Sequence, residues 1–335
     1  MADLNVSENK ELDVITTSED RGPQQVAIER GDSKSVRDAE SAVDGRARSK
    51  FRIAMILTAL YLSLFIAALD ATIVATALPS ITADLHSAAG YIWVGGAYLI
   101  ANAAAAPIWV KLSDIWGRKP IALGAVVVFF ASSIVCAVAV NMQMLIAGRS
   151  IQGAAAGGLI CMVNVTISDL FSVRERSLYL GLCEAIWALS GAVGPLLGGV
   201  FAQKVTWRWC FYCNLPVAGA AFLLLALFLD VHNPKTPMLE GIKAIDWFGS
   251  ISMVGLTVML LLGLDLGGAF YPWNSASVVC LLVFGALMSL VFIYSEKKLA
   301  KYPVLPLSLF KGTNIATLLV TFFHGLVRVP TSSCV

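Results

Sequence analysis

The sequence predicts an all-α integral membrane protein, and three observations support this fold class. Of the 335 residues, 58% are hydrophobic and only 14% are charged, whereas soluble domains are closer to half apolar and a quarter charged. Long apolar runs recur along the chain, and basic residues gather in alternate connections between them. A soluble core could not cover this much apolar surface, so we expect the lipid bilayer to surround the chain.

Eight apolar runs are long enough to cross a bilayer as helices, which takes roughly 20 residues. They cover residues 53–77, 90–110, 120–140, 144–167, 177–201, 208–229, 247–264 and 276–294. A ninth run begins near Thr313 and reaches about Val327 before a polar ending. We therefore expect eight spanning helices and the start of a ninth.

The basic residues predict how these helices are oriented. If the amino terminus is cytosolic, 20 of the 24 Lys and Arg residues fall in the inner segments, and the outer loops hold only Lys204 and Arg208. This asymmetry follows the positive-inside rule and predicts a cytosolic amino terminus. Residues 1–50 are polar and contain no aromatic side chain, so we expect them to form a disordered cytosolic tail.

Composition also excludes several partners. The net charge of +2 gives no reason to expect nucleic acid. Seven cysteines show no metal-ligand spacing, and the pair Cys210 and Cys213 lies in an apolar run, where small helix-packing residues are the better interpretation. We therefore expect no metal and no cofactor. A membrane-embedded enzyme would need a catalytic or metal cluster, and the three histidines are scattered.

Three charged residues lie well inside the spans, where charge is costly and often functional. Asp70 lies in the first run, with a packing carboxylate satisfied by hydroxyls such as that of Thr72 as the alternative. Arg149 lies in the fourth run and cannot lose its charge, which favours an interior role over snorkelling. Glu184 in the fifth run is expected to be a buried carboxylate that binds a proton or contacts substrate; the alternative is a hydrogen-bonded core residue.

Two glycine-containing segments predict close contacts. In the connection over residues 111–120, Gly117 permits a tight turn, and Asp114, Arg118 and Lys119 form a charge set that can latch neighbouring helix ends. The fifth run contains a group of residues that weaken and kink a helix, which is tolerated where helices move closely past one another. This group consists of Gly191, Gly194, Pro195, Gly198 and Gly199.

In this order, the segments resemble the major facilitator superfamily, in particular its 14-helix drug:proton antiporter branch of fungal toxin and multidrug efflux pumps. The resemblance covers about residues 50–327. The matching motifs are Leu-Asp-x-Thr-Ile-Val at Asp70, the gating loop at Asp114, Gly117, Arg118 and Lys119, the proton-coupling segment Arg149, Gln152 and Gly153, the antiporter motif at Gly194, Pro195, Gly198 and Gly199, and Trp207-Arg208-Trp209 with Asn214 and Pro216. Two positions depart from the pattern, because Val110 and Ser190 stand where the family often has glycine.

The resemblance implies how the chain is organised. A six-helix amino-terminal bundle would occupy residues 51–230, followed by a cytosolic loop over 231–245 and two linker helices over 246–295. Residues 296–335 would form a cytosolic loop and the first helix of an incomplete carboxyl-terminal bundle. We therefore expect either an incomplete product or a chain that dimerises, and by itself this chain is expected to be partial or inactive.

The resemblance also implies a function: a secondary active transporter that exchanges protons for toxins, drugs or secondary metabolites. Its partners would be the lipid bilayer, a small amphipathic organic substrate and protons. Asp70, Glu184, Arg149 and Gln152 would be the proton-coupling or substrate residues. The plasma membrane is the expected location, with a vacuolar or vesicular membrane left open. The alternative is a non-transporting membrane receptor or regulator, and the sequence leaves the substrate and the oligomeric state open.

Overall fold

The computed structural model describes residues 50–87, 90–229, 247–268 and 270–299, together with 315, 316 and 319. The predicted tail, the loop over 231–245 and nearly all of the ninth run lie outside the described residues. Within the described residues the regular structure is helical, with one isolated bridge between Gly267 and Tyr271. In the part of the chain that the structure describes, eight helical stretches are long and apolar enough to cross a membrane, which confirms the predicted fold class.

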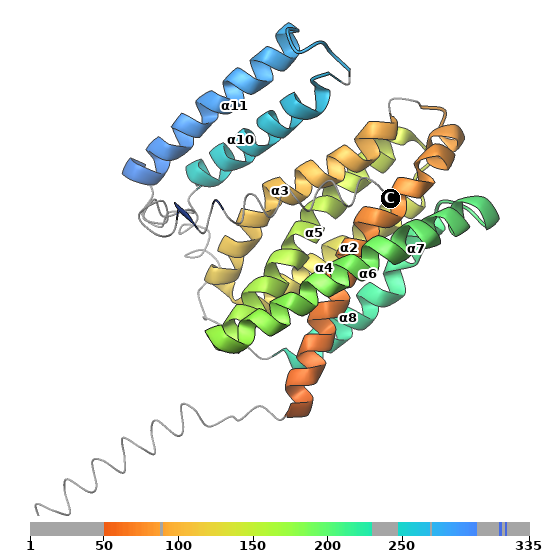
Figure 1. Ribbon diagram of the computed structural model, residues 1–335, viewed down its shortest axis with the longest axis vertical. Helices are drawn as coiled ribbons and strands as arrows, with labels where there is room; N and C mark the ends of the chain where they lie inside the picture. Colours follow the sequence, from red (N-terminus) through yellow and green to blue (C-terminus); the bar gives the residue numbers. More distant parts are fainter. Residues whose placement is uncertain are drawn as a thin grey trace, which may run out of the picture. The chain divides into compact units, whose positions relative to one another are not determined.

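The described helices follow one another along the chain (Figure 1). They are α2 (Lys50–Asp84), α3 (Gly90–Trp116), α4 (Arg118–Ala137), α5 (Met142–Leu170), α6 (Val173–Lys204), α7 (Trp209–Tyr212), α8 (Asn214–Phe228), α10 (Trp247–Leu266) and α11 (Ala276–Tyr294), with a short π-helix at Ser295–Leu299. Each of the first eight predicted runs lies on one of these helices, except that the third run continues three residues past the end of α4 and the sixth run is divided at Cys213 into α7 and α8.

Helix α2 is most deeply buried in its middle. Within residues 64–74, all but three side chains are buried. Its 35 residues extend for about 52 Å at 1.5 Å per residue, well beyond the roughly 30 Å of a bilayer's hydrocarbon core. Its two ends therefore reach past the hydrocarbon region, while its middle carries Asp70 and the residues that contact α6.

Helices α3 and α5 pack against each other through glycine. A Cβ atom on Gly153 would overlap the backbone of Tyr98, and one on Gly157 would overlap the carbonyl of Asn102. These two glycines are four residues apart, so they lie on one face of α5 and allow the two backbones to approach closely.

Helices α10 and α11 form an antiparallel pair (Figure 1). Gly263 of α10 packs against Leu282 of α11, and Gly285 of α11 packs against Leu260 of α10. The connection between the helices turns at Gly268, whose φ is +79°, a value that glycine adopts without steric cost. The Ser275 side chain then accepts a hydrogen bond from the backbone N–H of Val278 and caps α11.

Candidate functional site

A buried ion pair joins α2 to α5. The Nη1 atom of Arg149 lies 2.5 Å from Oδ2 of Asp70, and the two side chains are 1% and 0% exposed. A charge removed from water is very costly unless it is paired and hydrogen-bonded. The pair therefore accounts for two charges that the sequence places inside spanning helices, 79 residues apart.

Two amides complete the coordination of the Asp70 carboxylate. The Nε2 atom of Gln152 donates to Oδ1 of Asp70 at 3.0 Å, and the Nδ2 atom of Asn214 donates to the same oxygen at 2.7 Å. Gln152 is itself held from both sides, because its Nε2 also donates to Ser133 at 2.9 Å and its Oε1 accepts from Arg149 at 2.8 Å. Asp70, Arg149, Gln152 and Asn214 are together called the Asp70 site.

Aromatic rings and a carbonyl hold the Arg149 guanidinium on its other sides. Its central carbon lies 4.1 Å from the ring centre of Tyr98 and 5.8 Å from that of Phe211. Its Nε donates to the carbonyl of Val94 at 3.2 Å. The Tyr98 hydroxyl donates to the carbonyl of Ala67 on α2, which fixes the ring beneath the cation. Arg149 thus keeps attractive partners that do not depend on the charge of Asp70.

The structure brings together only part of the residues that the sequence singled out. Asp70, Arg149 and Gln152 meet, and Arg149 does not snorkel. The hydroxyl of Thr72 donates to backbone carbonyls, among them that of Ser190, and not to Asp70. The prediction that Glu184 is buried was wrong, because Glu184 is exposed on α6; its role as a proton-binding or substrate-contacting residue stays a prediction. An apolar run reveals that a carboxylate is within the span, but not which face of the helix carries it.

Sequence reasoning missed the role of Asn214. This residue is fully buried and is the first residue of α8, and the sequence marked it only as part of a motif with the residues from Trp207 to Trp209, without a partner. Tyr98 and Ser133 were not recognised either. Their signal was weak, because uncharged polar residues are common in spanning helices and each lies far along the chain from Asp70.

A second cluster lies at the junction of α3 and α4. Arg118 pairs with Asp114 at 2.5 Å and with Asp169, near the end of α5, at 2.8 Å. Its Nη1 also donates to the hydroxyl of Ser113 at 2.7 Å. These four residues are called the Arg118 cluster. Lys119 follows Arg118 and forms none of these ion pairs with the described residues.

The connection over residues 111–120 is shorter than predicted. Helix α3 continues to Trp116 and α4 begins at Arg118, so Gly117 alone separates them. Polar residues continue the helix beyond the apolar run, which is why hydropathy placed its end too early. Gly117 has φ 92° and ψ 164°, a conformation that is essentially restricted to glycine. The predicted tight turn at Gly117 is therefore present.

We expect Gly117→Ala to lower the free energy of unfolding by about 1–3 kcal/mol, because a Cβ is strained in this conformation. Gly124→Ala is the matched control, since Gly124 lies within α4 with nothing near its would-be Cβ. Thermal unfolding in detergent, followed by tryptophan fluorescence, measures both variants. Equal stability of the two variants would contradict the strained backbone at Gly117.

The antiporter motif in α6 divides into two faces. Gly194 and Gly198 are buried against α2, where a Cβ would overlap Thr72 and the carbonyl of Ile73, respectively. Gly191 and Gly199 have nothing within 4 Å of a would-be Cβ. Pro195 accepts a hydrogen bond at its carbonyl from Thr76 of α2, at 3.3 Å. One face of the motif therefore packs on the helix that carries Asp70, while Gly191 and Gly199 lie away from this contact.

The far end of α2 is held by a third group of polar contacts. Oδ2 of Asp84 accepts from Nε1 of Trp207 at 2.9 Å and from Nη1 of Arg208 at 3.2 Å. The guanidinium of Arg208 also donates to the carbonyl of Ala139 and lies 4.4 Å from the ring centre of Trp207. Asp84, Trp207 and Arg208 are called the Asp84 clasp, which ties α2 to the segment before α7.

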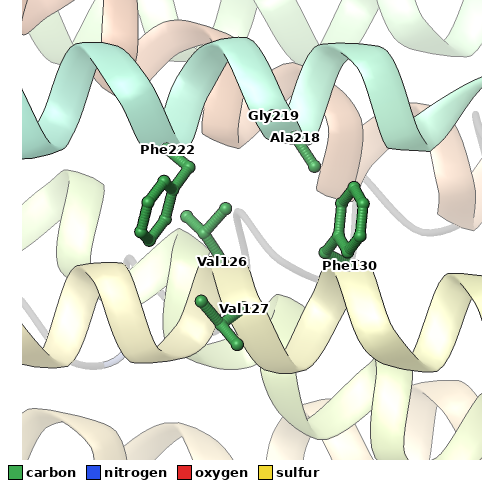
Figure 2. A pocket seen from close by; sticks show the side chains of 6 residues that line it. All are labelled: Val126, Val127, Phe130, Ala218, Gly219 and Phe222. Carbon is green, nitrogen blue, oxygen red and sulfur yellow. The ribbon is translucent and has the colours of Figure 1, made fainter.

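An apolar hollow of about 230 Å³ lies between α4 and α8. Figure 2 shows Phe222 of α8 and Phe130 of α4 at opposite ends of this hollow, with Val126 and Val127 along α4. Ala218 and Gly219 complete the lining, which contains no polar side chain. The lining of the hollow therefore offers nothing to bind a proton or a charged ligand.

Comparisons with known proteins agree on one family. A model described as "Major Facilitator Superfamily" matches residues 60–329. The chain is 51% identical over 293 residues to "Efflux pump dotC" of Dothistroma septosporum, covering 87% of this chain and 50% of that protein. It is 46% identical to "MFS-type transporter ppz2" of Metarhizium majus, with coverages of 88% and 51%. For "Efflux pump FUS6" of Gibberella fujikuroi, the identity is 39% and the coverages are 82% and 50%.

The chain thus spans about half the length of the curated relatives that it matches. Among solved structures, a bacterial homologue of the human lysosomal transporter Spinster, in an inward-facing and unoccupied conformation, superposes with a TM-score of 0.43 and 16% sequence identity. That match covers 74% of this chain and 61% of the other.

Proposed function

Since the chain belongs to the Major Facilitator Superfamily, we propose that it supplies the proton-binding part of an efflux antiporter for small amphipathic compounds such as toxins, drugs or secondary metabolites. The observation that carries this proposal is the Asp70 site, a titratable carboxylate buried against Arg149 inside spanning helices. Relatives that are called efflux pumps support the direction of transport. Their names favour transport over the receptor alternative.

The Asp70 site supports a simple charge switch. When Asp70 takes up a proton it becomes neutral and no longer attracts Arg149, which remains charged because its guanidinium does not deprotonate. Arg149 then keeps the faces of Tyr98 and Phe211 and the Val94 carbonyl as partners. The protonated and ionised states thus favour different positions of α5 relative to α2. A difference of this kind allows proton binding to shift a conformational equilibrium.

The Arg118 cluster and the glycine face of α6 are proposed to guide that conformational change. The cluster ties the ends of α3, α4 and α5 together through Asp114 and Asp169, so these ends would move as a unit. Gly194 and Gly198 let α6 slide close along α2. We place the amino terminus in the cytosol because of the distribution of basic residues. We place the protein in the plasma membrane, with vacuolar and vesicular membranes as the other possibilities.

The test is transport by the 335-residue chain in proteoliposomes under an imposed pH gradient, with a fluorescent amphipathic cation as the substrate. A single copy is expected to be partial or inactive, so we expect two copies of the chain together to move the dye against its gradient, and only while the pH gradient lasts. Asp70→Asn should abolish this movement, because it removes the proton site while keeping a polar side chain of similar size. Glu175→Gln, at an exposed position at the start of α6, should leave it unchanged. Absence of dye movement by the unmodified chain would refute the proposal for this chain.

A further inference from the structure

We propose that Asn214 is a positioning residue for Asp70, and that residues 207–214, called the strap, hold it there by gripping α2 at two separate points. The importance of this arrangement for transport rests on the proposed function. Its effect on proton binding by Asp70 does not, and is tested separately below.

The first grip is the amide of Asn214. Its Nδ2 atom donates to Oδ1 of Asp70 at 2.7 Å, and the side chain is fully buried. The other amide of the site, that of Gln152, donates to Oδ1 at 3.0 Å and shares its Nε2 with Ser133. A donor that faces a carboxylate oxygen stabilises the ionised carboxylate more than the protonated one. Asn214 therefore influences how readily Asp70 takes up a proton.

The second grip is the Asp84 clasp. Asp70 and Asp84 lie on the same helix, 14 residues and therefore about 21 Å apart. The strap contacts Asp70 through Asn214. It contacts Asp84 through Trp207 and Arg208. Because both ends of the strap are bound to α2, the position of Asn214 depends on the clasp as well as on its own contact.

One face of the strap is tightly packed. Cys210 and Phe211 are completely buried, and Trp207 is 4% exposed. The rings of Trp207 and Phe211 meet edge to face with their centres 6.1 Å apart, and Phe211 lies next to the Arg149 guanidinium. A packed single turn of helix such as α7 cannot absorb a displacement at one end, so a change at the clasp is passed on to Asn214.

The two carboxylates that the strap connects differ in their access to water. The Asp84 side chain is 50% exposed, whereas that of Asp70 is 0% exposed. The strap therefore links a carboxylate that meets the aqueous phase to one that does not. An altered contact at Asp84 should be detectable as altered proton binding at Asp70.

Other titratable groups also face Asp70 and belong in any interpretation of its pH profile. Arg149 comes from α5, Tyr98 from α3, and the thiols of Cys136, Cys210 and Cys213 from α4, α7 and the joint before α8. On α6, the neighbouring contacts with α2 come from the backbone of Ser190 and Pro195, which does not titrate. All of these groups are retained in the variants below.

The test measures proton uptake by Asp70 in the 335-residue chain in lipid nanodiscs. The infrared absorption of the protonated carboxyl is followed against pH and is assigned by its loss in Asp70→Asn. Asn214→Leu keeps the side-chain volume and removes the donor. We expect the midpoint of proton uptake to move about one to two pH units toward alkaline pH, which corresponds to one hydrogen bond to a charged group. An unchanged midpoint would overturn the role of Asn214.

Two further variants test the strap itself and keep the test decisive if Asn214→Leu does not fold. Asp84→Asn removes the charge of the clasp, and Trp207→Phe removes one donor while keeping an aromatic ring next to Phe211. Both should move the midpoint in the same direction by a smaller amount. Glu175→Gln neutralises an exposed carboxylate in the first turn of α6, at the other end of this helix from the strap. This variant should not move the midpoint of proton uptake. If Asp84→Asn and Glu175→Gln give the same midpoint, the strap does not connect the two carboxylates.

The outcome is separable from that of the transport assay. A shifted midpoint without any dye movement would support the strap and refute the proposed function of this chain. Dye movement with an unshifted midpoint would refute the strap and support the proposed function.

Discussion

Arg149→Leu is expected to lower the free energy of unfolding by about 3–5 kcal/mol, the cost of leaving one partner of a buried ion pair uncompensated. The loss arises because the Asp70 carboxylate keeps two amide donors but no cation. The eight tryptophans of the chain allow unfolding in mixed detergent micelles to be followed by fluorescence. The double variant Asp70→Leu with Arg149→Leu should be more stable than Arg149→Leu alone, because no buried charge is left unpaired.

Arg174→Leu provides the control for this prediction. Arg174 is exposed near the start of α6, and a surface substitution of this kind usually changes stability by less than about 0.5 kcal/mol. If Arg149→Leu were no more destabilising than Arg174→Leu, the guanidinium would have to be solvated, and the buried pair would be ruled out.

Gly198→Ala is expected to cost about 2–3 kcal/mol, toward the upper end of what one added methyl group costs in a packed interior. A Cβ at this position would overlap the carbonyl oxygen of Ile73 and the hydroxyl of Thr76. The first of these is backbone and cannot rotate away, so α2 and α6 must separate. Because α2 also carries Asp70, the same substitution should disturb the Asp70 site, and loss of dye transport should accompany the loss of stability.

Gly199→Ala is an unusually close control, because it adds the same methyl group one residue further along the same helix. Nothing lies within 4 Å of a Cβ at Gly199, and alanine is favoured over glycine in a helix interior by roughly 0.5–1 kcal/mol. We expect this variant to be as stable as the unmodified chain or slightly more stable. Matching losses at the two positions would show that helix flexibility, and not the contact with α2, is what glycine provides.

Much of the fold was predictable because the bilayer imposes a simple rule. A helix that crosses it must be apolar over about 20 residues, so length and hydropathy identified every described span. The ends were less predictable. Helix α2 continues to Asp84 and α3 to Trp116, because a helix can extend into the polar interface where hydropathy no longer marks it.

The Asp70 site was predictable in its charges but not in its geometry. Asp70 and Arg149 were recognisable because an ionisable side chain is rare in a span. Asn214 carries no charge and lies 144 residues from Asp70, so nothing in the linear pattern connects the two. Glu184 shows the opposite error: its charge was conspicuous, but the mostly apolar surroundings on α6 gave no information about which side of the helix it occupies.

The distances in sequence between members of the Asp70 site also bear on how the protein is made. Chain synthesis proceeds at about 5–20 residues per second, so Arg149 emerges roughly 4–16 s after Asp70, and Asn214 emerges roughly 7–29 s after it. During this interval the first helix holds a carboxylate without its later partners, and in an apolar medium a carboxyl group is far less costly when neutral. Until its neighbours are synthesised, the first helix must therefore be shielded from lipid, or it must enter the bilayer with Asp70 protonated.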